Sequence, residues 1–184
     1  EKKNKILTQY GDAHGFALTF NPSVQVKCAL NIERSLMGNA PTIRQLLYTY
    51  ELPHLQVWIM AHLQDLNEYV GVKNKMNINQ MKELAQMIIV NSQYLMASEI
   101  LLFFYKLKGG DFGGFYGAID PLKVGEQLQA FKQWRSQELT RLKHKKEFEE
   151  RERYRIEHQK HAITREEYER RCLQRGKKGT TGFI

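Results

Sequence analysis

Apolar side chains recur along this chain at intervals of three and four residues, which is the spacing of one face of an α-helix. The clearest example follows Pro53, where the positions that share a face are Leu55, Trp58, Ile59, His62, Leu63 and Leu66. We find no convincing run of alternating apolar and polar residues, which is the pattern of a half-buried strand. The pattern therefore predicts an all-α fold.

Several helix starts are marked by side chains that can accept the free backbone N–H groups of a first turn. Asn77, with Gln80 three residues later, predicts a capping box. Asp120–Pro121 predicts another start, since proline at the first helical position lacks only an N–H that would be unpaired there anyway. Thr164 with Glu167 forms a further capping box. These signals predict that helices begin immediately after each of them.

Helix-breaking residues and a shift in charge divide the chain into three parts. We expect residues 1–22 to be an irregular N-terminal arm, because glycines and an Asn-Pro step interrupt them. Residues 23–135 are predicted to form a compact helical globular domain. Residues 136–184 are predicted to be a basic, helical C-terminal extension, made of a long charged helix and a short last helix.

The excess positive charge lies in the last third of the chain. Residues 1–129 hold 12 basic and 11 acidic side chains, whereas residues 130–184 hold 16 basic and 9 acidic ones. This asymmetry is typical of a near-neutral globular part with a basic arm. Because neutralising phosphates releases counterions, such an arm is expected to bind DNA or RNA with an affinity that falls as salt rises.

The candidate phosphate contacts are basic side chains of this arm. They are Arg135, Arg141, Lys143, Lys145, Lys146, Arg170, Arg171, Arg175, Lys177 and Lys178. Glutamates are interleaved with many of them, and a helix of mixed charge is also typical of a solvated helix or of one that packs on a protein partner. Contact with nucleic acid, contact with a protein and a purely solvated helix are therefore all kept open.

The stretch from Gly109 to Pro121, GGDFGGFYGAIDP, holds five glycines and three aromatic residues. It lacks the companion motifs of a kinase and the lysine of a P-loop. Because glycines permit positive φ at helix ends, we interpret the stretch as a corner between two helices. Its aromatic residues Phe112, Phe115 and Tyr116 can pin that corner, and they are also candidate contacts to a protein or nucleic-acid partner.

Chemistry of other kinds has little support in the sequence. His54 and His62 are eight residues apart, and His158 and His161 are three apart, a spacing that can hold a metal. A histidine pair without a third ligand is more often structural or solvated. No nucleophile, base and orienting group occur together. We therefore expect no enzymatic activity, no metal and no cofactor.

The chain of 184 residues contains no run of 18 apolar residues, so we expect no membrane span and no membrane partner. Its beginning lacks the apolar core of a signal peptide. Cys28 and Cys172 are distant in sequence and suit a reducing compartment. These features favour the cytoplasm.

One ordered set of motifs carries a family resemblance. Phe103–Phe104 leads through Lys108–Gly110 into Phe112–Gly117 and then Asp120–Pro121. This order resembles a family of small uncharacterised proteins from Bacteroidota genomes, phages and mobile elements, in which Tyr-Gly-x-Phe-Tyr-Gly occupies the loop. Here Phe112 stands for the first tyrosine, and the resemblance covers residues 77–135. It implies a phage or mobile-element setting.

Two functions are consistent with these observations. The first is a non-enzymatic accessory protein of phage or mobile-element DNA metabolism, similar to a helicase loader or replication adaptor. Its helical core would bind a protein such as a helicase, and its basic arm would contact nucleic acid. That role rests on analogy with small helical proteins that have basic tails. The alternative is a structural or assembly protein of a virion or other particle, whose partners are protein subunits. The sequence leaves the oligomeric state open.

Overall fold

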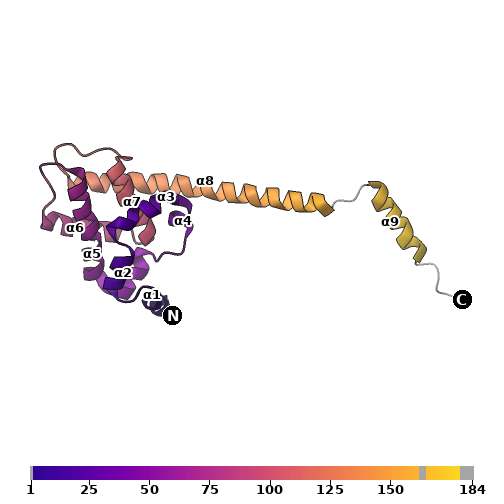
Figure 1. Cartoon of the computed structure of the whole chain (residues 1–184), viewed down its shortest axis with the longest axis horizontal. Helices are drawn as coiled ribbons and strands as arrows, with labels where there is room; N and C mark the ends of the chain where they lie inside the picture. Colours follow the sequence, from indigo (N-terminus) through magenta and orange to yellow (C-terminus); the bar gives the residue numbers. More distant parts are fainter. Residues whose placement is uncertain (1, 162–164, 179–184) are drawn as a thin grey trace. The chain divides into compact units, whose positions relative to one another are not determined.

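The computed structural model describes residues 2–161 and 165–178, which form α-helices and one 3-10 turn, with no β-strand among them (Figure 1). The predicted all-α fold is confirmed. The elements are α1 (Lys2–Tyr10), α2 (Ala13–Thr19), η1 (Pro22–Val24), α3 (Gln25–Leu30), α4 (Ile32–Met37), α5 (Ile43–Val70), α6 (Ile78–Asn91), α7 (Ala97–Gly109), α8 (Pro121–His161) and α9 (Arg165–Lys178). None of the helices in these ranges is long and apolar enough to cross a membrane.

The contacts divide the chain into a compact unit, Glu1–Thr140, and an extension unit, Arg141–Ile184. The helix α8 begins in the compact unit and continues into the extension unit without a break. We describe the two units separately and use these two names for them below.

The expected irregular arm at residues 1–22 is wrong, because α1 and α2 occupy most of that segment. Gly11, with φ of 73°, makes the turn between the two helices. Phe16 of α2 is 1% exposed, and its ring centroid lies 5.5 Å from that of Tyr50 and 5.1 Å from that of Trp58. The segment therefore contributes to the core of the compact unit. Its glycine marks a turn between helices rather than a lack of helix.

The core of the compact unit confirms the inward face predicted for α5. The six side chains on that face are each at most 3% exposed. Against them pack α6 and α7 (Figure 1), and the paired rings Phe103 and Phe104 of α7 are fully buried. The helical spacing of apolar residues had thus identified the buried face before any tertiary contact was known.

Two of the predicted helix starts are confirmed. Asn77 Oδ1 accepts the backbone N–H of Gln80 at 2.9 Å, and Gln80 Oε1 accepts the backbone N–H of Asn77 at 2.9 Å, so the capping box is complete. Asp120 Oδ1 accepts the N–H of Leu122 at 2.9 Å at the start of α8. Thr164, proposed to cap the last helix, lies outside the described residues.

The helix α5 is bent at Glu51, which has φ of 67° and ψ of 165° inside an otherwise helical run. Only glycine adopts this region of backbone space without strain, and a side chain there costs about 1–3 kcal/mol. Pro53 follows two residues later and cannot supply the N–H of a regular helix. The break between the two helical parts of α5 therefore lies at Glu51.

Replacing Glu51 by glycine is expected to stabilise the protein, because the strain disappears while no buried contact is lost. We expect a gain of about 1 kcal/mol after the added entropy of the unfolded chain is subtracted. Thermal unfolding followed by circular dichroism measures it. Glu51→Ala is the control, since it removes the same exposed side chain but keeps a Cβ in the strained conformation. An equal effect of both substitutions would contradict the assignment to strain.

Candidate nucleic-acid interface

Arg135, expected to contact phosphate, has a structural role instead. Its Nε donates to Glu99 Oε1 at 2.6 Å, and the Glu99 side chain is fully buried. Glu99 Oε2 accepts the backbone N–H of Met96 at 2.7 Å. Burial raises the pKa of Glu99, while Arg135 and the Met96 N–H act in the opposite direction. Because the Arg135 guanidinium is paired with the buried Glu99 carboxylate, Arg135 is not available as a phosphate contact.

The remaining basic candidates whose side chains are described all lie in the extension unit and are exposed. They are Arg141, Lys143, Lys145, Lys146, Arg170 and Arg171. Arg175, Lys177 and Lys178 lie in the last turn of α9, and their side chains lie outside the described ones. The candidate set therefore reduces to side chains that solvent, and any ligand, can reach.

Acidic side chains engage part of this charge. Lys145 Nζ lies 3.8 Å from Glu149, and Arg171 donates to Glu167 at 2.7 Å, each one helical turn away. Among the described side chains, Lys143 and Arg170 form no ion pair. Exposed pairs of this kind stabilise a helix by only a few tenths of a kcal/mol, so a phosphate can replace the carboxylate at little cost.

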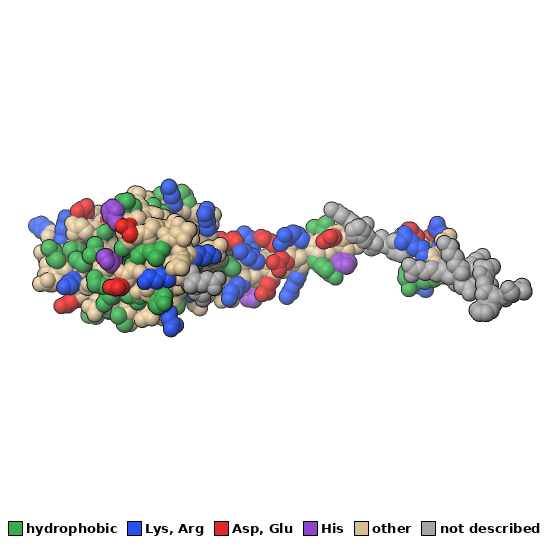
Figure 2. All heavy atoms as spheres, turned by 90° about the horizontal axis from the view of Figure 1, so that it is seen from below, with side chains coloured by type: hydrophobic (Ala, Val, Ile, Leu, Met, Phe, Trp, Pro, Cys, Tyr) green, Lys and Arg blue, Asp and Glu red, His purple; other side chains and the backbone are tan. Residues whose placement is uncertain are grey.

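The charges of α9 are distributed unevenly along its length. Glu166 and Glu167 occupy the first turn, whereas five of the six basic residues follow Glu169, the last acidic residue of the helix. Both positions are favourable for the helix dipole, which attracts anions at the N-terminus and cations at the C-terminus. On the part of α8 in the extension unit, basic and acidic side chains are interspersed (Figure 2), although residues 141–146 hold four basic and no acidic ones. Residues 141–146 and 170–178 are therefore the two densest purely basic segments of the extension unit.

The glycine-rich stretch forms the corner that the sequence predicted between α7 and α8. Gly110, Gly113 and Gly117 all have positive φ, between 74° and 102°. The Phe112 ring contacts the buried Phe131 ring edge-on at 6.1 Å, so it anchors the corner. Tyr116, by contrast, is 89% exposed. Only part of the proposed aromatic contact set thus faces solvent.

The histidines divide between core and surface. His62 is fully buried, whereas His54 is exposed on the same helix, so the two do not share a site. His62 Nε2 lies 3.0 Å from the carbonyl oxygen of Phe20, which can only accept, and His62 Nδ1 therefore accepts from Gln25 at 2.8 Å. Burial lowers the pKa of His62 to about 4. His62 is a neutral, structural histidine.

The second pair, His158 and His161, does not form a described site. His158 is exposed and its ring lies 4.0 Å from that of Tyr154, while the His161 side chain lies outside the described ones. Within the described residues, no group of three or more His, Cys, Asp or Glu side chains is placed to hold a metal ion.

The fold brings together one set of polar residues that no motif in the sequence connects. A cavity of about 430 Å³ between α2 and α5 is lined by Asp12, His14, Glu51 and His54, among others. Asp12 is already engaged as the N-cap of α2, where its Oδ1 accepts the Gly15 N–H at 2.8 Å. Because residues 12–14 and 51–54 come from separate elements, only their tertiary proximity reveals this set.

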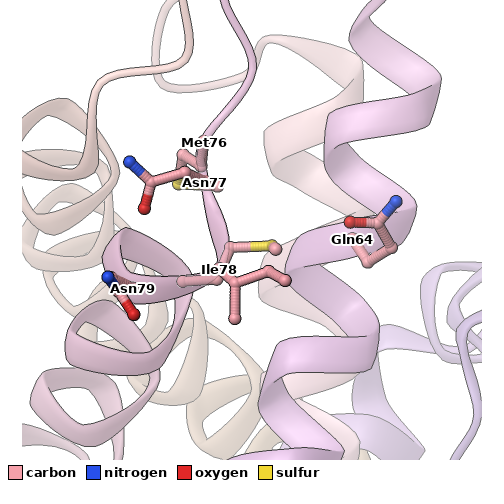
Figure 3. Close-up of a pocket in the computed structure, with 6 residues that line it drawn as sticks. Gln64, Met76, Asn77, Ile78 and Asn79 are labelled. Atoms are coloured by element: carbon pink, nitrogen blue, oxygen red, sulfur yellow. The ribbon is translucent and has the colours of Figure 1, made fainter.

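A larger open groove of about 570 Å³ lies between α5 and the beginning of α6. Figure 3 shows Gln64 on one side of this groove and Ile78 facing it from α6. Gln64 donates to Glu68 at 2.8 Å, and Asn77 is committed to its capping box. The lining residues supply amides, thioethers and one aliphatic side chain, so the groove suits contact with a surface better than acid–base chemistry.

Comparison with known proteins gives one result. No curated protein and no solved structure matches this chain. A family described as a family of unknown function, DUF6633, matches residues 75–178. The match begins before α6 and continues to the end of α9, so it includes the glycine-rich corner and the basic extension, whereas the sequence resemblance had covered only residues 77–135. The chain belongs to the DUF6633 family of unknown function.

Proposed function

We propose that this protein is a non-enzymatic nucleic-acid-binding accessory protein, in which the extension unit contacts the phosphate backbone and the compact unit binds a protein. One observation carries the proposal: the extension unit contains 14 basic and 8 acidic side chains, against 14 and 12 in the compact unit, which is about three times as long. Counterion release turns such a concentration of positive charge into salt-dependent affinity for DNA or RNA.

A finer form of the proposal places the protein in the DNA metabolism of a phage or mobile element, as an adaptor similar to a helicase loader. The resemblance of the Phe103–Pro121 motifs supports that setting, and the division between a compact helical unit and a basic extension supports an adaptor. The open groove between α5 and α6, with Ile78 70% exposed, offers the compact unit a surface for a protein partner.

The test compares two full-length variants that lose the same charge at different places. Lys143→Gln/Arg170→Gln removes two cations of the extension unit that form no ion pair with any described side chain, whereas the control, Lys27→Gln/Lys82→Gln, removes two exposed lysines of the compact unit. Affinity is measured by fluorescence anisotropy with labelled single- and double-stranded DNA at two salt concentrations. We expect the first variant to bind roughly tenfold more weakly, with a salt slope smaller by about two.

The control variant is expected to keep the affinity of the native chain, because its lysines do not contact phosphate. Equal losses in both variants would show that only net charge matters. Binding that does not weaken with salt, or no binding at low salt, would contradict the proposed function.

The second candidate, an assembly protein of a particle, is favoured by the apolar side chains that the extension unit exposes. Phe148, Tyr154 and Leu173 are each at least 64% exposed. Helical side chains of this kind are normally covered by a partner helix. Light scattering after size-exclusion chromatography separates the candidates, since a stable oligomer free of nucleic acid supports assembly and a monomer that binds DNA supports the first function.

A further inference from the structure

The glycine-rich corner presents aromatic rings and a cation together on the surface of the compact unit. Tyr116 is 89% exposed and Phe115 is half-buried. Lys123 Nζ lies 5.5 Å from the Tyr116 ring centroid and 6.0 Å from that of Phe115. A ring on which a base can stack, next to a cation that can meet a phosphate, is the combination with which proteins bind single-stranded nucleic acid.

The corner is fixed by hydrogen bonds to segments distant in sequence. The backbone N–H of Asn74 donates to the Gly117 carbonyl at 3.3 Å, and the N–H of Ile119 donates to the Asn74 carbonyl at 3.0 Å. From α8, Gln127 Nε2 donates to the Gly113 carbonyl at 2.5 Å. The backbone on both sides of Tyr116 is therefore held by hydrogen bonds. Less conformational entropy of the protein is lost when a base stacks on its ring.

The bridge at Asn74 also brings further positive charge to the corner. Lys73 and Lys75 flank Asn74, both are exposed, and neither forms an ion pair within the described residues. The acidic side chains near the rings in sequence are Asp111, which pairs with Lys106 Nζ at 2.6 Å, Asp120, which accepts the Leu122 N–H, and Glu126 on the next turn of α8. Lys123 thus lies beside the rings, the bridge brings the backbone of two further lysines to the corner, and two of the three carboxylates already have partners.

A buried amide beneath the corner has an unused acceptor. Gln127 is 3% exposed, and its Oε1 has no hydrogen-bond partner although its Nε2 holds Gly113. A buried acceptor is normally satisfied by protein, water or a ligand. The N3–H of an unpaired thymine and the exocyclic amino groups of adenine, cytosine and guanine are donors of the required kind.

From these observations we infer that the corner formed by Phe115, Tyr116 and Lys123 is a stacking site for unpaired bases, so that the protein selects single-stranded over double-stranded nucleic acid. The inference rests on the proposed function and adds its ligand class. In a duplex the bases are stacked on each other and paired, so an exposed ring finds no free face there. The extension unit gains affinity from phosphates of either form, whereas the corner gains affinity only from a single strand.

The test uses the full chain and two tyrosine variants. Tyr116→Ala removes the ring, and Tyr116→Phe keeps a ring that can stack. The matched control is Tyr48→Ala, because Tyr48 is 74% exposed and has Lys3 Nζ 5.9 Å from its ring centroid but lies on α5, away from the corner in sequence. Each protein is titrated by anisotropy with labelled oligothymidine and with a hairpin duplex, after its thermal unfolding is shown to match that of the native chain.

We expect Tyr116→Ala to weaken oligothymidine binding roughly tenfold, which is within the range for loss of one base–aromatic stack, and to leave duplex binding unchanged. Tyr116→Phe and Tyr48→Ala are expected to bind like the native chain. If Tyr116→Ala leaves oligothymidine binding unchanged while Lys143→Gln/Arg170→Gln still weakens it, the inference is overturned. The proposed function then stands without a stacking site at the corner. If the native chain binds neither probe, both are overturned.

Discussion

Arg135→Ala is expected to lower the free energy of unfolding by about 3–5 kcal/mol, the largest change that we predict for any single substitution. The guanidinium of Arg135 is the charged partner of the fully buried Glu99 carboxylate. Removing it leaves that carboxylate buried with only the Met96 N–H as a donor. The cost is therefore the penalty of an unpaired buried charge, and it exceeds the net value of the ion pair itself.

Urea unfolding at neutral pH measures this change, with Arg151→Ala as the matched control. Arg151 lies on the same helix and is exposed, so its removal is expected to change stability by less than about 0.5 kcal/mol. The double variant Glu99→Gln/Arg135→Met is expected to recover part of the loss, because no buried charge remains. A loss below about 1 kcal/mol for Arg135→Ala would show that the pair does not hold α7 to α8.

The second large effect concerns pH. Because the pKa of His62 is lowered from 6.5 in the unfolded chain to about 4 in the folded protein, protons bind more tightly to the unfolded state. The stability that neutral His62 provides is therefore complete above pH 6.5 and is lost as the pH falls toward 4. The loss amounts to about 3 kcal/mol, since one pKa unit corresponds to about 1.4 kcal/mol.

Urea unfolding between pH 7 and pH 4 measures the slope, and His62→Gln supplies the reference because its side chain does not titrate. The groups that face His62 are Gln25, which donates to Nδ1, and the Asp65 and Lys108 pair beside it. Subtracting the two curves cancels the titration of Glu99 and other groups. A flat difference curve for His62 would contradict the buried neutral state.

The sequence identified the elements whose signals are local. The inward face of α5 followed from apolar spacing, and the Asn77–Gln80 box followed from two side chains within one turn. At η1 and α3 the local pattern is misleading. The apolar residues between Ser23 and Leu36 have the spacing of a single helix, yet the helix breaks at Asn31 and Leu30 is 83% exposed. Which face of this short amphipathic segment is buried depends on its packing against α7, and the local sequence pattern does not contain that information.

The candidate site was predicted to a similar extent. The division of charge could be proposed from the residues alone. The sequence left open whether Tyr116 pins the corner or faces a partner, and the structure leaves it 89% exposed. The role of Arg135 could not, since its partner Glu99 lies 36 residues away. A basic residue in a sequence carries its charge visibly, but whether that charge is free depends on which carboxylate the fold places beside it.

By itself, then, the sequence determined the helical class, the helix starts at Asn77 and Asp120 and the concentration of charge after Thr140, because each depends on residues within a few turns of one another. Only the tertiary structure decided that residues 1–22 join the core, that Glu51 bends α5, and that Asn74 carries two lysines to the glycine-rich corner. These features depend on distant segments meeting, and such meetings are selected by the packing of the whole compact unit at once.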